Sequence, residues 1–131
     1  MKIGIFGANG RMGRVLIEAI TNADDTTLTA ATVRDGSNWA NMDVGEIAGI
    51  GTLGISCQAV STLQSDQVDV MIDFTLPEAF EGNLQWCVEN RVAMVIGTTG
   101  LNPSQLDKLT AASQHIPLVF AANYSVGICL L

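Results

Sequence analysis

Apolar residues lie along this chain in short runs, and amphipathic segments separate many of these runs. The runs predict strands at residues 3–6, 28–33, 55–60, 68–75, 92–96 and 116–121. Several of the segments between them are long enough for helices of ten or more residues. Strands that alternate with such helices favour an α/β fold of the doubly wound type, with a mainly parallel sheet and helices on both faces.

The predicted helices are marked by their apolar spacing and their end signals. The first follows residues 3–6 and ends at the polar residues 22–25; its apolar residues lie three and four apart, on one expected face: Met12, Val15, Leu16, Ala19 and Ile20. In the next helix, Thr75 and Glu78 have the spacing of a capping box and Pro77 stands in the first turn. Its expected apolar face comprises Phe80, Leu84, Cys87 and Val88. In a later helix the signals are Asn102 as N-cap, Pro103 as first helical residue and Gln105 three residues after the cap.

Residues 35–54 form a long, glycine-rich segment between two predicted strands. A loop of this length inside a compact domain is usually functional or mobile, so we expect a surface excursion. Within it, residues 44–48 predict a short helical turn. Beyond the strand at 55–60, residues 61–66 predict a brief helix or turn.

Three glycines, Gly7, Gly10 and Gly13, join the first strand to the first helix. A glycine turn at a helix N-terminus can hold an anion, because the first turn of a helix has free N–H groups and a positive dipole end. Gly7 permits the tight turn, Gly10 lets the backbone approach a pyrophosphate, and Gly13 allows close packing of helix and strand. The spacing is one residue away from the dinucleotide fingerprint G-x-G-x-x-G. It predicts a Rossmann-like dinucleotide site, and the alternative is a structural turn that binds nothing.

Composition narrows the class of protein further. The 131 residues carry a net charge of −7, which argues against nucleic acid or an anionic membrane as a partner. The three cysteines are widely separated among apolar neighbours, as expected for reduced core residues of a cytosolic protein. Of the six cations, Arg11 and Arg14 flank the glycine turn and Arg34 stands where the second strand ends. We interpret Arg14 as a solvated helix residue.

Other kinds of chemistry have little support. No cluster of His, Cys and Asp has metal-ligand spacing, and no serine elbow of the G-x-S-x-G type occurs. Asp73 follows a strand without a visible acidic or basic partner, so we interpret it as a carboxylate that orients its loop by accepting backbone N–H bonds. The single histidine, His115, is expected at the surface or at a helix end. A short-chain dehydrogenase is excluded, because Tyr124 lacks a lysine four residues later.

Four motifs together resemble one enzyme family. They are Gly7-Ala-Asn-Gly-Arg-Met-Gly13, Val70-Met-Ile-Asp-Phe-Thr75, Val95-Ile-Gly-Thr-Thr-Gly100 and Phe120-Ala-Ala-Asn-Tyr-Ser-Val-Gly127. In order and spacing they are similar to 4-hydroxy-tetrahydrodipicolinate reductase, an enzyme of lysine and diaminopimelate biosynthesis. The resemblance implies a cytoplasmic, usually homotetrameric oxidoreductase that uses NAD(P)H to form tetrahydrodipicolinate from a cyclic dicarboxylate.

The resemblance also implies which residues bind the cofactor. Those expected at the pyrophosphate are Gly7, Ala8, Asn9, Gly10, Arg11 and Met12, and Arg34 would meet the adenosine ribose. Those expected on the nicotinamide side are Gly97, Thr98, Thr99, Ala121, Ala122, Asn123 and Tyr124. No catalytic residue and no metal ligand is expected in this chain.

The chain departs from the family pattern in two places. Val33 stands where an acidic residue often precedes the arginine. The family's second domain, with its histidine-rich catalytic motif and lysine, has no counterpart. We therefore expect residues 1–125 to be a dinucleotide-binding domain and residues 126–131 to begin a hinge toward a missing domain, with the apolar tail short of partners. The chain alone is expected to be inactive; the alternative is a stand-alone, regulatory dinucleotide-binding module.

The residues at the second strand end predict the cofactor preference. An NAD site usually places an acidic side chain about twenty residues after the glycine turn, and Val33 offers no acceptor. Arg34 is a permanently charged donor suited to a phosphate. Asp35 and Asp43 would weaken this effect if they faced the pocket. We expect NADPH to be preferred and NADH to be accepted.

Overall fold

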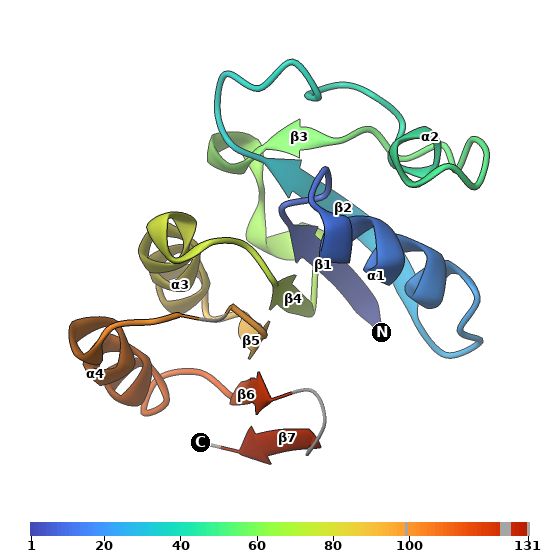
Figure 1. Ribbon diagram of the computed structural model, residues 1–131. Coiled ribbons are helices and arrows are strands. Elements are labelled where there is room, and N and C mark those ends of the chain that lie inside the picture. Colours follow the sequence, from blue (N-terminus) through green and yellow to red (C-terminus); the bar gives the residue numbers. More distant parts are fainter. Residues whose placement is uncertain (99, 124–126, 131) are drawn as a thin grey trace. The chain divides into compact units, whose positions relative to one another are not determined.

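The computed structural model describes residues 1–98, 100–123 and 127–130, with side chains up to residue 119 (Figure 1). The chain divides into two compact units, Met1–Asp69 and Val70–Leu131, and each unit contains both strands and helices. Among the described residues, no helix is both long enough and apolar enough to cross a membrane.

The first unit is a three-stranded parallel sheet with a helix against it. Its strands are β1 (Lys2–Phe6), β2 (Thr27–Val33) and β3 (Gln58–Ala59), in the order β3-β2-β1. Helix α1 (Arg11–Thr21) contacts β1 and β2, and the short helix α2 (Val44–Ala48) lies in the glycine-rich segment as predicted. Two 3-10 turns, Val60–Thr62 and Ser65–Gln67, follow β3.

The buried face of α1 differs from the predicted one. Gly13, Ile17 and Ile20 are buried, whereas Met12 is 36% exposed and Val15 is 54% exposed. The cause is Gly13, which packs against the backbone of the preceding turn and so fixes the rotation of the helix. Residues four and seven positions after Gly13 then face the sheet.

The second unit continues the alternation of strands and helices. Its elements are β4 (Val70–Asp73), α3 (Pro77–Asn90), β5 (Ala93–Ile96), α4 (Pro103–Ala112), β6 (Leu118–Asn123) and β7 (Gly127–Leu130). Strands β4, β5 and β6 are parallel, and β7 pairs antiparallel with β6. The backbone of residues 127–130 is thus paired with β6, whereas the apolar side chains that were expected to lack partners lie outside the described part of the structure.

Two predicted strands are shorter than expected. In the run 55–60 only β3 pairs with β2, because Ile55 and Cys57 bond instead to the backbone of Val44, Asn41 and Met42. In the run 68–75 the strand ends at Asp73, because the Thr75 backbone N–H donates to the Asp73 carboxylate and the chain forms a turn there.

The start of α3 corrects a predicted cap. Thr75 is not the N-cap; Leu76 is, in an extended conformation with φ −81° and ψ 158°. Proline restricts the residue before it to this region, so Pro77 sets the helix start one residue later than predicted. The Thr75 side chain donates a hydrogen bond to Asp73 instead.

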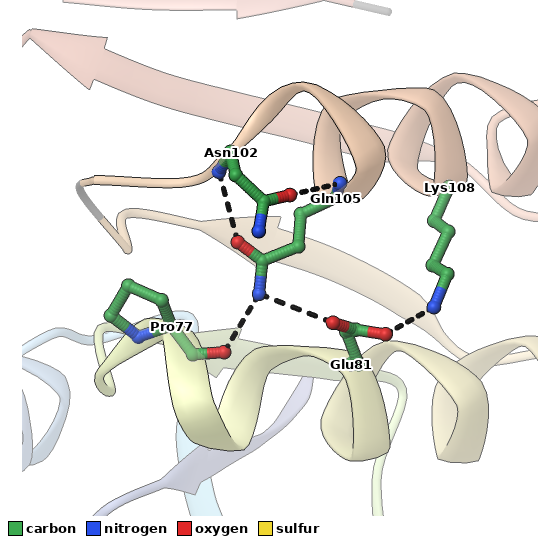
Figure 2. Close-up of polar contacts among 5 residues, drawn as sticks. All are labelled: Pro77, Glu81, Asn102, Gln105 and Lys108. Carbon is green, nitrogen blue, oxygen red and sulfur yellow. Dashed lines mark hydrogen bonds and ion pairs between the residues drawn. The ribbon is translucent and has the colours of Figure 1, made fainter.

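The capping box of α4 is confirmed, and it also joins α4 to α3 (Figure 2). Asn102 Oδ1 accepts from the backbone N–H of Gln105 at 2.8 Å, and Gln105 Oε1 accepts from the backbone N–H of Asn102 at 3.0 Å. The Gln105 side chain is 5% exposed, and its Nε2 donates to the Pro77 carbonyl at 3.0 Å and to Glu81 at 3.3 Å. Glu81 also forms an ion pair with Lys108. One buried amide thus fixes the helix that follows the β5 loop to the helix that follows the β4 loop.

Candidate functional site

The glycine turn is fixed to the neighbouring strand by its backbone. The amides of Gly7 and Ala8 both donate to the carbonyl of Thr32 in β2, each at 2.9 Å. Gly7 has a φ of 76°, a conformation that glycine adopts without strain. The amide of Gly10 then donates to the Gly7 carbonyl at 3.0 Å and closes the turn. The turn is therefore held in shape by backbone groups of the first unit.

The start of α1 leaves its first amides available to an anion. Gly10 is the N-cap and has no side chain to occupy them, and the first turn carries no acidic residue. The first hydrogen bond of the helix, from the Arg14 amide to the Gly10 carbonyl, leaves the amides of residues 11–13 without an intrahelical acceptor. A Cβ on Gly13 would lie 2.2 Å from the Gly7 carbonyl oxygen, so only glycine allows this approach. Free amides at the start of a helix whose N-cap has no side chain fit a phosphate group.

Two arginines stand near this turn in the sequence and in the fold. Arg11 opens α1, and Arg34 follows β2 two residues after Thr32. The Arg34 side chain is exposed and forms no hydrogen bond or ion pair with another described residue. Val33, in contrast, is 1% exposed and packed in the core. Of these two neighbours, only Arg34 can meet a ligand at the strand end.

The two acidic residues near Arg34 are engaged elsewhere. Asp35 Oδ1 accepts from the Ser61 amide at 3.1 Å. Asp43 caps α2 and accepts from four amides: Gly45 at 2.8 Å, Glu46 at 3.3 Å, Leu53 at 2.9 Å and Gly54 at 2.7 Å. These bonds, the one from Leu53 most of all, lower the pKa of Asp43 below its usual value. The Asp43 carboxylate therefore closes its own loop.

Arg14 has a contact that the sequence did not predict. Its guanidinium carbon lies 5.5 Å from the centroid of the Trp39 ring, within the range of a cation–π interaction. Arg14 is an exposed residue of α1, as interpreted from the sequence, and this contact also joins α1 to the segment after β2. No sequence signal marks this pair, because Trp39 lies in an irregular segment without periodicity.

A buried polar cluster lies at the end of β4 in the second unit. Asp73 is fully buried, and its oxygens accept from the Thr75 amide at 2.8 Å, Thr75 Oγ1 at 2.5 Å, Asn83 Nδ2 at 3.1 Å and Thr98 Oγ1 at 3.4 Å. Burial raises the pKa of Asp73, and the donors oppose this shift. The predicted role of a carboxylate that orients its loop is confirmed by the bond from Thr75.

The described residues predicted for the nicotinamide side belong to strand β6 and to the turn after β5. Gly97 and Thr98 follow β5, and the backbone of Ala121, Ala122 and Asn123 belongs to β6. Thr99 and Tyr124 lie outside the described residues. The residues predicted for the pyrophosphate and adenosine belong to the first unit, and the nicotinamide-side residues belong to the second.

Other titratable groups do not form a second site among the described residues. No group of three or more His, Cys, Asp and Glu residues there could hold a metal ion. His115 is exposed and lies between α4 and β6, as expected for a helix-end residue. Cys57 and Cys87 are buried free thiols, and burial raises the pKa of Cys57 to about 11.

The glycine turn between β1 and α1, with parallel strands in both units, places the chain in the class of α/β proteins with a Rossmann-like fold. The sequence family described as Dihydrodipicolinate reductase, N-terminus, matches residues 1–124. The chain belongs to this family.

Curated relatives cover the chain almost completely. One from Pseudoalteromonas atlantica, named 4-hydroxy-tetrahydrodipicolinate reductase, is 58% identical over 130 residues, which are 99% of this chain and 49% of the relative. One of the same name from Alkalilimnicola ehrlichii is 53% identical and covers 98% of this chain and 48% of its own length. The chain thus spans about half the length of the curated relatives it matches.

Solved structures agree with the fold. A dipicolinate-bound dihydrodipicolinate reductase from Paenisporosarcina sp. TG-14 has a TM-score of 0.73 at 22% identity, covering 96% of this chain and 48% of that protein. An aspartate semialdehyde dehydrogenase with NADP from Candida albicans has a TM-score of 0.67 at 16% identity, covering 95% and 43%. At such identities the likeness shows the fold alone, and it confirms the predicted Rossmann-like class.

Proposed function

We propose that this chain is the dinucleotide-binding part of a 4-hydroxy-tetrahydrodipicolinate reductase. The observation that carries the proposal is the glycine turn: a loop anchored to the Thr32 carbonyl that leads into a helix N-terminus without a side-chain cap. The relatives' shared name supplies the reaction, a reduction, and a nicotinamide cofactor held at this turn would supply the hydride.

The binding roles follow from the groups that each residue offers. The backbone of Gly7, Ala8, Asn9 and Gly10, with the first amides of α1 at Arg11 and Met12, holds the pyrophosphate. Arg34 meets the adenosine ribose. Gly97, Thr98 and Thr99, together with residues 121–124, hold the nicotinamide side. In this arrangement the chain binds and orients the cofactor and excludes water, while the proton donor and the contacts to the cyclic dicarboxylate belong to a second domain.

NADPH binds more tightly than NADH in this proposal. The exposed Arg34 side chain has no partner among the described residues, and its planar guanidinium suits a 2′-phosphate. Among the described residues, neither Asp35 nor Asp43 forms an ion pair with Arg34, and both carboxylates accept backbone amides instead. Val33 is buried and offers the ribose hydroxyls no acceptor. NADH is still accepted through the pyrophosphate contacts that both cofactors share.

The proposal extends to the domain organisation, assembly and cellular location of the whole protein. Residues 1–125 form the cofactor domain, and the chain from residue 126 leads to the substrate domain. The whole protein works as a cytoplasmic homotetramer in lysine and diaminopimelate biosynthesis. Buried free thiols at Cys57 and Cys87 are consistent with a reducing compartment.

Binding and turnover can be measured separately to test the proposal. Calorimetric titration should give one saturable site for NADPH and for NADH on this chain. Addition of 4-hydroxy-tetrahydrodipicolinate should cause no NADPH oxidation by the chain alone. Oxidation should appear when the chain is fused to the remaining half of the Pseudoalteromonas atlantica relative. Turnover by the chain alone, at the rate of that relative, would contradict the division of roles; a fusion that binds NADPH but never turns over would contradict the reaction.

A further inference from the structure

The loops that follow β4 and β5 are held together by one residue, Asp73. Its main-chain carbonyl accepts the Gly97 amide at 2.7 Å, and Thr98 Oγ1 lies 3.4 Å from both that carbonyl and the carboxylate. The same carboxylate accepts from Thr75 and Asn83. Asp73 therefore bonds to Gly97 and Thr98, the two residues directly after β5, while its own loop is fixed by Thr75.

Packing restricts the same turn from a second side. A Cβ on Gly97 would lie 2.0 Å from the Phe74 ring, so the ring occupies the space that any larger residue would need. Further along, the Gln105 amide that fixes α4 to the Pro77 carbonyl limits movement of the segment after the turn (Figure 2). The turn at residues 97–98 is thus held by hydrogen bonds and by an aromatic contact.

These contacts change what Thr98 can offer to a ligand. The residue is 2% exposed, and its hydroxyl already donates to Asp73. The hydroxyl proton is therefore not available to the carbonyl oxygen of a nicotinamide carboxamide, and the backbone N–H of Thr98 is the donor that this residue can still offer. The position of that backbone depends on the bonds to Asp73.

We propose that Asp73 is a positioning residue for the nicotinamide half of the cofactor, acting through the turn at Gly97 and Thr98. This inference rests on the proposed function, which places the turn beside the nicotinamide. Its independent support is the bonding geometry: a carboxylate is removed from water at the carboxyl end of a strand, where ligands of such sheets bind. Burying a charged side chain costs free energy. If Asp73 served only to pack the core, an apolar residue of similar volume would stabilise the fold as well or better.

The test compares two ligands that differ only in the nicotinamide end: NADPH and 2′-phospho-ADP-ribose. Asp73→Asn should weaken NADPH binding about tenfold, because the Asn amide cannot accept from every donor around Asp73. Binding of 2′-phospho-ADP-ribose should stay within about twofold of wild type. Asp107→Asn, an exposed site on α4, is the matched control and should change neither affinity. Titration calorimetry of wild type and the two variants with each ligand gives all six affinities.

A second pair of variants covers the case in which Asp73→Asn does not fold. Thr98→Val removes the hydroxyl at nearly constant shape and should reproduce the selective loss, whereas Thr98→Ser should restore NADPH binding. Equal losses for both ligands would show a purely structural role, and no loss in either variant would show that the turn does not depend on Asp73; both results overturn the inference. If wild-type protein binds neither ligand, the proposed function itself fails, and this inference fails with it.

Discussion

A Cβ on Gly13 would lie 2.2 Å from the carbonyl oxygen of Gly7, and both that oxygen and the Gly13 Cα that would carry the Cβ are backbone atoms. Neither can move as a flexible side chain would, so helix α1 approaches the turn this closely only because residue 13 is glycine. The contact fixes the rotation of α1 and brings its first amides over the turn.

Gly13→Ala is therefore expected to destabilise the fold by about 1–3 kcal/mol, the range for added volume in a packed region. Chemical denaturation gives the free energy of unfolding. Gly82→Ala is the matched control: Gly82 lies inside α3, and a Cβ added there would meet nothing within 4 Å, so alanine should stabilise by about 0.5–1 kcal/mol. Similar effects of the two substitutions would show that the close contact at Gly13 carries no energetic weight.

Arg34→Ala tests the cofactor preference. Loss of one charge-assisted hydrogen bond to the 2′-phosphate corresponds to about 1.5–3 kcal/mol, or a roughly 10- to 150-fold weaker affinity for NADPH. NADH affinity should change little, and the NADPH effect should shrink as salt is raised. Arg34→Lys keeps the charge but not the planar fork, so it should give an intermediate NADPH affinity. Equal weakening of NADH and NADPH by Arg34→Ala would show that Arg34 does not bind the 2′-phosphate.

The Asp43 carboxylate is expected to make part of the free energy of unfolding depend on pH. Four backbone amides lower its pKa in the folded state below 3.8, so the folded protein releases this proton more readily than the unfolded chain. The stabilisation is fully present above pH 3.8 and is lost as the pH falls through the lower, folded-state pKa. Asp43→Asn should therefore be less stable than wild type at neutral pH, and the difference should narrow below pH 3.8.

Denaturation curves from neutral pH down to below pH 3.8 provide that comparison. Asp35→Asn is the control, because Asp35 accepts one backbone amide where Asp43 accepts four. A constant difference between wild type and Asp43→Asn across the whole range would mean that the Asp43 charge does not contribute to closing its loop.

Gln105 is the buried amide that joins the two helices of the second unit. Gln105→Met keeps the volume but leaves the Pro77 carbonyl and the Asn102 amide without their partner, at an expected cost of about 1–3 kcal/mol. Gln85→Met on the exposed side of α3 is the matched control and should stay within about 0.5 kcal/mol of wild type. A neutral Gln105→Met variant would contradict a structural role for the amide.

Elements with local signals were predictable from the sequence. The start of α4 depends on Asn102, Pro103 and Gln105, which lie within four residues of one another, and the capping box formed as expected. The short helix α2 also has the predicted bounds, between Asp43 as N-cap and Gly49 in a left-handed conformation. Caps and left-handed glycines act through near neighbours, so their effect can be recognised without knowing the tertiary structure.

Features set by distant contacts were not predictable in the same way. The apolar spacing of α1 favoured Met12 and Val15 as buried, but the contact between Gly13 and Gly7 set a different face. Thr32 closes the glycine turn with its carbonyl, a group that every residue has, so no sequence signal marks it. Asn83 could have been found, since it is a polar residue beside Phe80 and Leu84 on the buried side of α3.

The most direct test of the central claim, that the turn between β1 and α1 binds the cofactor pyrophosphate, is the NADPH affinity of Gly10→Ser. Gly10 is the N-cap, with φ −78° and ψ 168°, and a Cβ there would lie 3.4 Å from the Gly7 carbonyl oxygen, so serine fits with at most a small adjustment. Serine is a favoured N-cap whose hydroxyl would occupy an amide that the pyrophosphate needs. We predict an unchanged or higher melting temperature with NADPH binding weakened at least about tenfold. A stable Gly10→Ser protein that binds NADPH as tightly as wild type would contradict the claim.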